Sequence, residues 1–586
     1  VLPLDFNWQV AYGRANYLCQ TRWNRIQREL DTLSDTERRW AAGLKLWLAR
    51  GGSGQMQDLQ LDNEGVSLWN KISCQRHGCF GNACTWVKEC YLNAARRKLA
   101  KADVIVINHA LLLSDVSAEG RILPEYRHLV IDEAHNLDRT AFDKLGIQFS
   151  IHECNRLLNK ITEKRDRIER GYLASLHARF PNLTNEIAAL RTKVETARQQ
   201  VLALTAIHIS IVVGMSGSRR LTKGMKGIAD LSKAGTETSA DLRSVERGLY
   251  EMAYELREHP EENEVNVLMG EVAEASLAIG VIADSLEALS DEEVVWVEWD
   301  DYRIRLLATA PLEIGKRLDE LLYKQLDSAI MVSATLTVGD SFTFIKRRLG
   351  VDRVDDDRVS VWKTESPFDY DNNCLGLAVK NIQQPGSPQY AESIAECIKT
   401  IARNIDKRTL VLFTSRSLLT QTARLLEEEP GEWTGRIISQ YQDGEYGTLI
   451  AKLQASSDGI LFGTETFWEG VDLPGDMLQC LVVTRLPFRP PSEPLTEAWL
   501  EHLKRLGRNG FMDYSLPEAV IRFRQGVGRL IRSETDTGVL VILDKRFCVP
   551  PAGMRYSELF RTSIPINNLT DINGDQLAGQ LASWFE

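Results

Sequence analysis

The sequence predicts an α/β protein with two parallel-sheet domains, and three observations lead to this fold class. Short apolar runs that end in polar residues recur along the chain, as in strands that a sheet buries on both faces. The runs form two sets, and a long segment with a helical, charged pattern lies within the first of them. Helical stretches separate the runs of the second set, which indicates repeated strand–helix–strand units.

The predicted strands of both sets are defined by their apolar runs. The first set consists of Asp103–Asn108, His128–Asp132 and Ala329–Ser333. The second set consists of Thr409–Phe413, Gly459–Phe462, Leu481–Thr484 and Val539–Leu543. Because the runs are almost continuously apolar, we expect each sheet to be covered on both faces.

Two insertions interrupt the first set of strands. The segment from about Phe142 to Leu289 is mostly helical and charged, as in Asn185–Leu204, and predicts an inserted helical domain. The segment from about Cys19 to Ala100 contains a dense group of cysteines. At 586 residues the chain is long enough for three or four domains in all.

The composition limits the class of protein. The net charge of −11 argues against binding polyanions with the whole surface, although a local basic groove remains compatible with it. The first residues, Val1–Asp5, do not form a signal peptide, and the lack of an initiator Met suggests that the chain begins inside a longer protein. The longest apolar stretch, Val201–Met215, is too short to span a bilayer, so we expect a core segment and no membrane association.

The ten cysteines fall into two groups. Five are isolated and mostly in apolar surroundings, which is typical of inert buried thiols: Cys154, Cys374, Cys397, Cys480 and Cys548. The other five are concentrated near the start of the chain: Cys19, Cys74, Cys79, Cys84 and Cys90. Without a secretory signal, this density indicates a reducing, cytoplasmic compartment and a metal site rather than disulfides.

Two carboxylates follow directly after a predicted strand in Asp132-Glu133-Ala134-His135. Ligands of α/β nucleotide-binding domains lie beyond the carboxyl ends of the strands. There Asp132 can hold Mg²⁺ through water, and Glu133 can orient or deprotonate the attacking water. His135 can couple this site to other parts of the protein. The alternative is a helix N-cap, where acidic residues are common for another reason.

The segment Gln525–Arg532 predicts the cationic side of the same site. Arg529 and Arg532 are three positions apart, which would place both on one face of a helix, where two guanidinium groups suit a γ-phosphate. Gln525 lies one turn before Arg529, and Gly528 lets the backbone approach closely. The alternative is an amphipathic helix with solvated arginines.

A glycine-bounded loop, Gly463–Asp472, follows another predicted strand and suits a nucleotide-dependent switch. We expect Gly463 to permit the sharp turn, and Glu469 and Asp472 to sense nucleotide and hold the arginines. The aromatic pair Phe467-Trp468 in this loop could instead belong to the core.

Hydroxyl groups at strand ends are candidates for contact with nucleic acid. Ser333 and Thr335 can bond a phosphate backbone or relay between sites, and Thr414 and Ser415 can act likewise. We place Thr464 in the same class.

The ordered set of these motifs resembles the DinG branch of the DinG/XPD helicases, iron–sulfur members of helicase superfamily 2. The resemblance rests on Val130–His135, Ser333–Leu336, Thr464–Asp472, Arg485–Phe488 and Gln525–Arg532. It implies two RecA-like motor domains, an inserted iron–sulfur domain and an inserted helical arch. It also implies ATP and Mg²⁺ as cofactors, movement from 5′ to 3′ on single-stranded and tailed duplex DNA, and a role in DNA repair or replication. We expect a monomer.

The resemblance also predicts the domain boundaries. Residues 1–18 would be a remnant of motor domain 1, 19–102 the iron–sulfur domain, 103–141 the part of motor domain 1 that holds Asp132, 142–300 the arch, 301–338 the end of motor domain 1, and 339–586 motor domain 2.

The dense cysteines form a tight thiolate array. Four residues separate Cys79 from Cys84, and five separate Cys84 from Cys90. Spacing alone does not choose between zinc and an iron–sulfur cluster. The resemblance implies a [4Fe–4S] cluster on these three residues and on Cys19, which lies in a Gly-Arg-x-Asn-Tyr-x-Cys stretch; Cys74 is the alternative fourth ligand. Arg14 of that stretch is expected to contact nucleic acid, and the cluster can be a structural pin or a redox centre.

The phosphate-gripping loop of such a motor is missing from the sequence. No Gly-x-x-x-x-Gly-Lys-Ser/Thr occurs in it. We interpret the chain as a truncated or incomplete copy and expect little ATP hydrolysis from it alone. The alternative is a non-catalytic nucleic-acid-binding remnant. A redox enzyme would need a flavin- or nicotinamide-binding motif, and the sequence contains none. A nuclease would need a further set of metal-binding acidic residues, and the sequence shows none beyond the ATP site.

Overall fold

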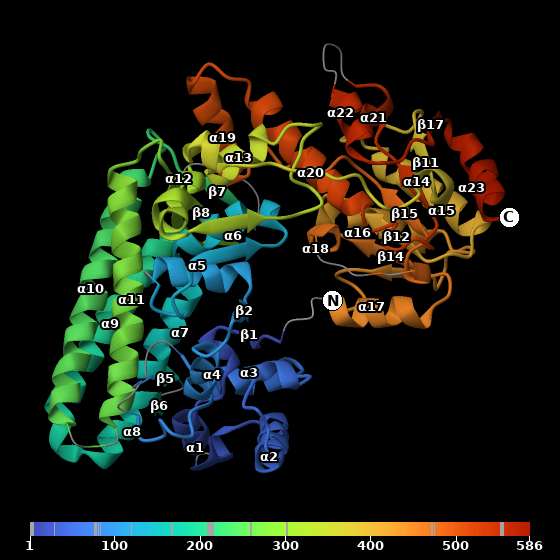
Figure 1. The fold of residues 1–586 in the computed structure, drawn as a ribbon. Coiled ribbons are helices and arrows are strands. Elements are labelled where there is room, and N and C mark those ends of the chain that lie inside the picture. Colours follow the sequence, from blue (N-terminus) through green and yellow to red (C-terminus); the bar gives the residue numbers. More distant parts are fainter. Residues whose placement is uncertain are drawn as a thin grey trace. The chain divides into compact units, whose positions relative to one another are not determined.

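A computed structural model of the chain describes residues 5–28, 30–75, 79, 81, 84–118, 120–165, 168–207, 216–257, 259, 261–300, 303–469, 473, 475–550 and 556–586 (Figure 1). The chain forms two compact units. One consists of Val1–Leu129 and Leu137–Ser328, and the other of Val130–Asn136 and Ala329–Glu586. The second unit is therefore discontinuous in sequence, because it includes the short segment that holds Asp132 and His135.

A seven-stranded sheet forms the centre of the second unit. Its order is β13 (Ile437–Ser439), β14 (Ile460–Gly463), β12 (Thr409–Leu412), β15 (Cys480–Val483), β16 (Gly538–Ile542), β11 (Cys374–Val379) and β17 (Leu569–Ile572). All six neighbouring pairs are parallel. This confirms the predicted α/β class, and the four strands predicted downstream all occur. The strands β11, β13 and β17 were not predicted.

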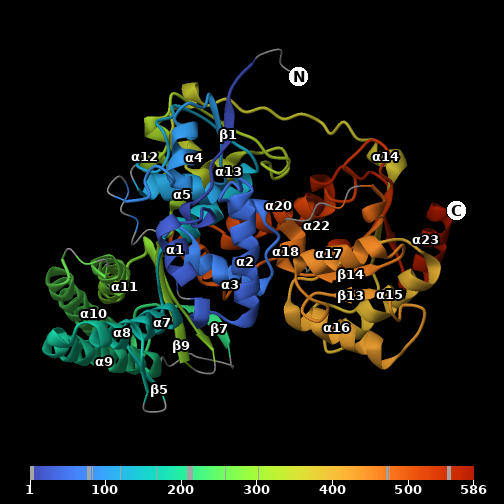
Figure 2. The same cartoon turned by 90° about the horizontal axis from the view of Figure 1, so that it is seen from below.

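Helices cover both faces of this sheet. One core lies under α15 (Tyr390–Asn404), α16 (Arg416–Glu428) and α23 (Leu577–Phe585). The other lies under α17 (Tyr446–Ala455), α18 (Glu465–Glu469), α20 (Leu516–Val527) and α22 (Tyr556–Ser563). Figure 2 shows α16 and α17 on opposite sides of β13 and β14. The apolar strand runs are buried from both sides, as parallel sheets require.

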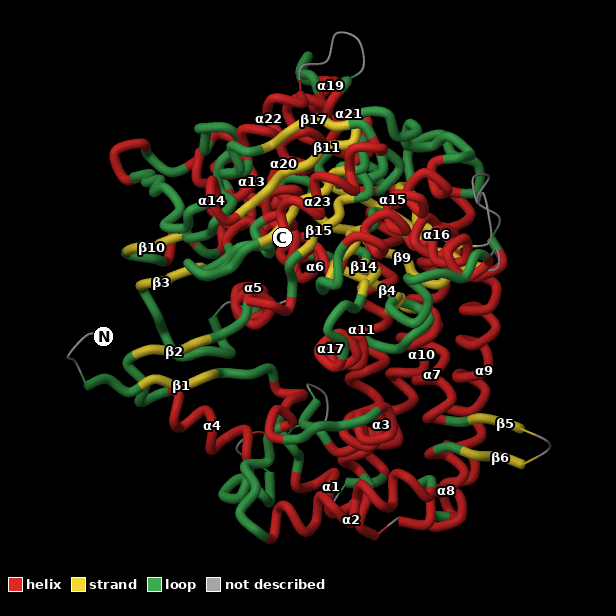
Figure 3. The backbone as a smooth tube through the Cα atoms, turned by 90° about the vertical axis from the view of Figure 1, so that its right-hand side faces the viewer, coloured by secondary structure: helices red, strands yellow, loops and turns green. Residues whose placement is uncertain are grey.

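The upstream strands are shorter and less covered than the sequence predicts. β1 (Trp8–Val10) pairs in parallel with β2 (Val104–Val106), and β3 (His128–Ile131) pairs with β10 (Ser328–Met331) (Figure 3). In β2 the side chains of Val104 and Val106 are 45% and 49% exposed. The expectation that these strands are buried on both faces is therefore wrong, because alternate side chains of β2 meet no covering element among the described residues.

The helical insertion is built on a sheet that the sequence did not predict. Long helices α9 (Thr184–Ala206), α10 (Ile228–Glu255) and α11 (Glu262–Glu287) share a core with an antiparallel sheet of order β4-β9-β8-β7. These strands are Ile147–Ser150, Arg303–Pro311, Glu293–Asp300 and Ser216–Arg220, in the same order.

The pairing of β8 with β9 corrects one predicted boundary. The two strands pair from Glu293 with Pro311 to Asp300 with Arg303. A division between residues 300 and 301 would cut this hairpin, so the predicted arch must extend to Pro311.

The cysteine-rich segment has its own small helical core. It contains α1 (Gln20–Arg28), α2 (Asp35–Ala49), α3 (Asn63–Ile72) and α4 (Tyr91–Leu99). A capping box begins α2: the Ser34 hydroxyl accepts from the Glu37 N–H, and the Glu37 carboxylate accepts from the Ser34 N–H. Trp23, Leu68 and Trp69 form the centre of this core.

Helix α11 has the length and composition of a membrane-spanning helix. A core helix of a soluble protein passes the same test. Its residues Val265, Val272 and Ile279 are fully buried in the core shared with α10. Of the apolar stretch noted in the sequence, 201–206 ends α9 with Val201 and Leu204 buried, and 208–215 lies outside the described residues.

Candidate active site and cysteine cluster

The predicted acidic pair lies in a tight turn directly after β3. The backbone N–H of Glu133 donates to the Asp132 carboxylate over 2.9 Å, and Glu133 has φ +47°. Positive φ is costly for a residue with a side chain, so surrounding contacts must hold this turn. One such contact joins the Ala134 N–H to the Val332 carbonyl at 3.1 Å. Both carboxylates are solvent-exposed, as a water-mediated metal site needs.

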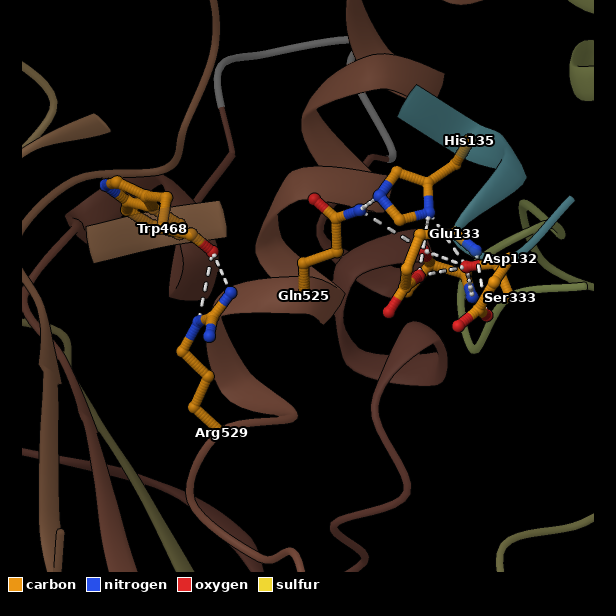
Figure 4. Close-up of polar contacts among 8 residues, drawn as sticks. Asp132, Glu133, His135, Ser333, Trp468, Gln525 and Arg529 are labelled. Atoms are coloured by element: carbon orange, nitrogen blue, oxygen red, sulfur yellow. Dashed lines mark hydrogen bonds and ion pairs between the residues drawn. The ribbon is translucent and has the colours of Figure 1, made fainter. Parts of the chain in front are cut away.

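His135 is the centre of a hydrogen-bonded group that brings distant segments together (Figure 4). Its Nδ1 lies 2.8 Å from the Ser333 hydroxyl and 3.2 Å from the Thr335 hydroxyl. The Ser333 hydroxyl donates to the Glu133 carboxylate over 2.9 Å. Gln525, in the last turns of α20, places its side-chain nitrogen against Nε2 of the ring and 3.3 Å from the Thr335 hydroxyl. The His135 side chain is only 6% exposed.

The contacts of His135 allow one continuous direction of hydrogen bonding. When the Gln525 amide nitrogen donates to Nε2, the ring proton lies on Nδ1. Nδ1 then donates to Ser333, which donates to Glu133. A chain of contacts therefore runs from Gln525 through His135 and Ser333 to the Glu133 carboxylate, and the relay expected of Ser333 and Thr335 stays a prediction.

The two predicted arginines do not lie on a helix. α20 ends at Val527, and Gly528 is its C-cap. Arg529 lies beyond it, and its guanidinium donates twice to the Trp468 carbonyl, at 3.1 and 2.9 Å. The Arg532 N–H donates to the Asp536 carboxylate at 2.8 Å. The prediction that both arginines share one helix face is wrong, because the helix ends before either of them.

The glycine-bounded loop is anchored by its aromatic residues. Phe467 and Trp468 are buried, which supports the core alternative, and the Trp468 indole N–H donates to the Phe413 carbonyl at 3.0 Å. A Cβ on Gly463 would lie 2.4 Å from the Phe467 ring, so glycine is required there. The backbone of Glu469 ends α18, whereas its side chain and the whole of Asp472 lie outside the described residues.

The remaining predicted hydroxyls lie at carboxyl ends of the large sheet. Thr414 follows β12, and Ser415 is the N-cap of α16, accepting from the Leu418 N–H at 3.3 Å. Thr464 follows β14 and is largely buried. Its N–H and its hydroxyl both donate to the Gln440 side-chain oxygen, at 2.7 and 3.0 Å.

Three of the dense cysteines, Cys19, Cys74 and Cys90, lie around Tyr17. Cys19 and Cys90 pack against the small core of Tyr17, Cys74 and Leu92. The Cys84 sulfur lies 3.7 Å from the Thr21 hydroxyl.

Cys79 interacts electrostatically with its neighbours. A hydrogen bond with Cys74 is the largest influence that lowers the pKa of Cys79, and Arg14 and Arg96 lower it further. Arg14 therefore lies within electrostatic reach of the thiols. Four soft sulfur donors in one region fit an iron–sulfur cluster chemically. Within the described part of the chain, however, no three His, Cys, Asp or Glu side chains are already arranged to hold a metal ion.

Comparisons with known proteins find similar sequences and a similar fold. The family model described as the helicase C-terminal domain matches residues 398–565, and the family model DEAD_2 matches residues 80–154. The "ATP-dependent DNA helicase DinG" of Photobacterium profundum is 28% identical over 616 residues, covering 96% of this chain and 84% of that protein. These matches support a DinG/XPD-type helicase of superfamily 2.

A second relative and a solved structure are also similar to this chain. The "3'-5' exonuclease DinG" of Bacillus subtilis (strain 168) is 28% identical over 608 residues, which is 99% of this chain. The chain spans only 64% of the length of that relative. The solved structure titled "XPD_Helicase" covers 98% of this chain with a TM-score of 0.55 at 14% identity, and this chain covers 87% of it, so it shows a shared fold.

Two residues near Thr464, Gln440 and Tyr441, were missed by sequence reasoning. The hydroxyl of Tyr441 lies 2.8 Å from that of Thr464, and Arg416 lies over the Tyr441 ring with its guanidinium carbon 4.6 Å from the ring centre. Tyr441 has φ +79°, a conformation that side chains rarely adopt. Gln440, next to it, binds Thr464 as described above. No motif marks Gln440 and Tyr441, because their importance comes from a partner far along the chain.

Proposed function

We propose that this protein is an ATP-dependent DNA helicase of the DinG type that moves from 5′ to 3′. The observation that carries the proposal is the hydrogen-bonded path from Gln525 through His135 and Ser333 to Glu133. It joins three segments that are distant in sequence around one exposed carboxylate. A path of this kind suits a motor, because it can link the state of the attacking-water site to movement of α20.

Each residue has an expected role at the ATP site. Asp132 holds Mg²⁺ through water, and Glu133 orients or deprotonates the attacking water. Arg529 and Arg532 stabilise the charge that develops on the γ-phosphate. Glu469 and Asp472 respond to the nucleotide.

DNA is the proposed substrate, as single strands and tailed duplexes. Thr414, Ser415 and Thr464 lie at carboxyl ends of the large sheet, where a bound strand could meet their hydroxyl and backbone N–H groups. Arg14 is a further candidate. We expect the protein to act in DNA repair or replication, as a cytoplasmic monomer.

The test is strand separation by the full-length gene product. Wild type should unwind a duplex with a 5′ tail and not one with a 3′ tail. Glu133→Gln should abolish both unwinding and DNA-stimulated ATP hydrolysis while leaving DNA binding intact. Glu125→Gln is a matched control, because Glu125 is an exposed acid on the same segment outside the site. Equal unwinding by wild type and Glu133→Gln would refute the role assigned to Glu133.

An iron–sulfur cluster is the second part of the proposal, with Cys19, Cys79, Cys84 and Cys90 as ligands. The packing of Cys19 and Cys90 beside Tyr17, and the electrostatic interaction of Cys79 with Cys19, support it. Cys84→Ser should remove the iron and the visible absorbance of the purified protein, whereas Cys74→Ser should retain both. Loss in both variants would make Cys74 a ligand.

A non-catalytic nucleic-acid-binding protein is the other candidate. The lack of a Gly-x-x-x-x-Gly-Lys-Ser/Thr segment in the sequence favours it. Tight DNA binding without any ATP hydrolysis by the full-length product, unchanged in Glu133→Gln, would select this candidate.

A further inference from the structure

One face of the long helix α10 carries a stripe of basic and aromatic side chains. We call Arg243, Arg247, Tyr250, Tyr254 and Arg257 the α10 stripe; the last of them lies just beyond the helix end. Successive members are four, three, four and three positions apart, so they share one face. At 1.5 Å per residue the stripe is about 21 Å long.

This face is exposed. Tyr250 and Tyr254 are 64% and 59% exposed, and the three arginines are exposed as well. The Arg257 guanidinium lies over the Tyr254 ring, 4.3 Å from its centre. A different face of α10 packs against neighbouring elements, and its residues Leu242, Val245 and Leu249 are fully buried. The stripe is therefore not part of the core.

The acidic residues of α10 lie beside the stripe and not within it. They are Asp230, Glu237, Asp241, Glu246, Glu251 and Glu255. Two of them are used within the arch: Glu251 pairs with Lys193 at 3.2 Å, and Glu237 accepts from the Gln200 side chain at 2.7 Å.

The stripe arginines differ in this respect. Arg243 and Arg247 form no ion pair with any residue in the described ranges. In a chain with a net charge of −11, a face with three arginines and no acid is a local reversal of charge.

We propose that the α10 stripe binds single-stranded nucleic acid; the inference rests on the proposed DNA-directed function and adds a site to it. Guanidinium groups match phosphate oxygens in charge and geometry. Exposed tyrosine rings offer flat surfaces on which unpaired bases stack. The arginines lie at both ends of the stripe and the two tyrosines lie between them, so one strand could meet both kinds of side chain, with its phosphates on the arginines and its bases on the rings. A duplex would hide its base faces from Tyr250 and Tyr254, so the chemistry selects single strands.

The test measures binding of a fluorescent oligothymidylate to the full-length protein by anisotropy, over a range of salt concentrations. Arg243→Ala/Arg247→Ala should weaken binding and reduce the slope of log affinity against log salt by about 1.4, from about 0.7 for each phosphate contact. Tyr250→Ala/Tyr254→Ala should weaken binding at least about fivefold. Tyr250→Phe/Tyr254→Phe keeps the rings and should bind as wild type does.

A matched control removes two other exposed arginines of the same unit. Arg156→Ala/Arg305→Ala should leave the salt slope unchanged, because both side chains are paired with acids outside the stripe. If wild type binds but either the arginine pair or the tyrosine-to-alanine pair binds equally well, the stripe proposal is overturned. Loss of affinity for an acidic peptide, with DNA binding unchanged, would also overturn it. If wild type binds no DNA, the proposed function itself fails.

Discussion

Substitution of Gly526 by alanine tests the packing that holds Arg529 in place. Gly526 lies in the last turn of α20, and a Cβ there would lie 2.7 Å from the Trp468 indole ring. The indole cannot move away cheaply, because it is buried and its N–H is bonded to Phe413. The backbone carbonyl of Trp468 is the group that binds Arg529. A shift of Trp468 would therefore move the carbonyl to which Arg529 donates.

Two opposing effects determine the expected magnitude. Alanine is favoured over glycine inside a helix by roughly 0.8–1 kcal/mol. Overpacking of a tight core costs about 1–3 kcal/mol. We therefore expect Gly526→Ala to lower the free energy of unfolding by about 1 kcal/mol, and to lower ATP turnover as well. Gly579→Ala in α23 is the matched control. No atom outside its own turn lies within 4 Å of the added Cβ, so this change should raise stability by about 0.5 kcal/mol.

Urea unfolding followed by far-UV circular dichroism measures both variants against wild type. The expected signs are opposite, which separates the steric effect from helix propensity. A Gly526→Ala protein as stable as Gly579→Ala, with normal turnover, would refute the inferred contact with Trp468.

Three further predictions concern other parts of the second unit and the isolated thiols. Burial alone would raise the pKa of Asp536, but hydrogen bonds from Ser533 and Arg532 outweigh burial and lower that pKa. Asp536→Asn should therefore lower the free energy of unfolding by about 1–3 kcal/mol near pH 7. When stability is measured at decreasing pH, this difference from wild type should shrink below about pH 4. Tyr441→Phe should keep the fold but weaken single-strand binding, since Thr464 loses a hydroxyl partner; unchanged affinity in an anisotropy titration would show that this contact is not used. Burial raises the pKa of five thiols to about 12: those of Cys154, Cys374, Cys397, Cys480 and Cys548. Iodoacetamide at pH 8 should therefore leave these five thiols of the native protein unmodified. Their rapid labelling, detected by mass spectrometry, would contradict this prediction.

The parts of the site that the sequence predicted depend on local patterns. An apolar run followed by acids or hydroxyls marks a strand end, so the positions of Asp132, Ser333 and Thr464 followed from sequence alone. The fold class followed from the same runs. His135 and Gln525, which contact each other, belong to two motifs that the sequence analysis recognised by their order along the chain.

The parts that were missed depend on contacts between distant residues. The end of α20 is set by tertiary contacts as well as by its glycines, so the path of Arg529 could not be derived from spacing. Tyr441 matters because of its backbone conformation and its bond to Thr464, neither of which a motif records. The hairpin from Glu293 to Pro311 was not predicted from the sequence, and its strand pairing identifies it.

The discontinuity of the second unit has a practical consequence for how the protein is dissected. A recombinant fragment that starts at Ala329 would contain the entire seven-stranded sheet and yet lack Val130–Asn136. In such a fragment Ser333, Thr335 and Gln525 would face the space that His135 fills. Their polar groups would form hydrogen bonds with water instead. The free energy of unfolding measured for the fragment would then describe an incomplete unit. A faithful fragment needs Val130–Asn136 restored through an engineered linker.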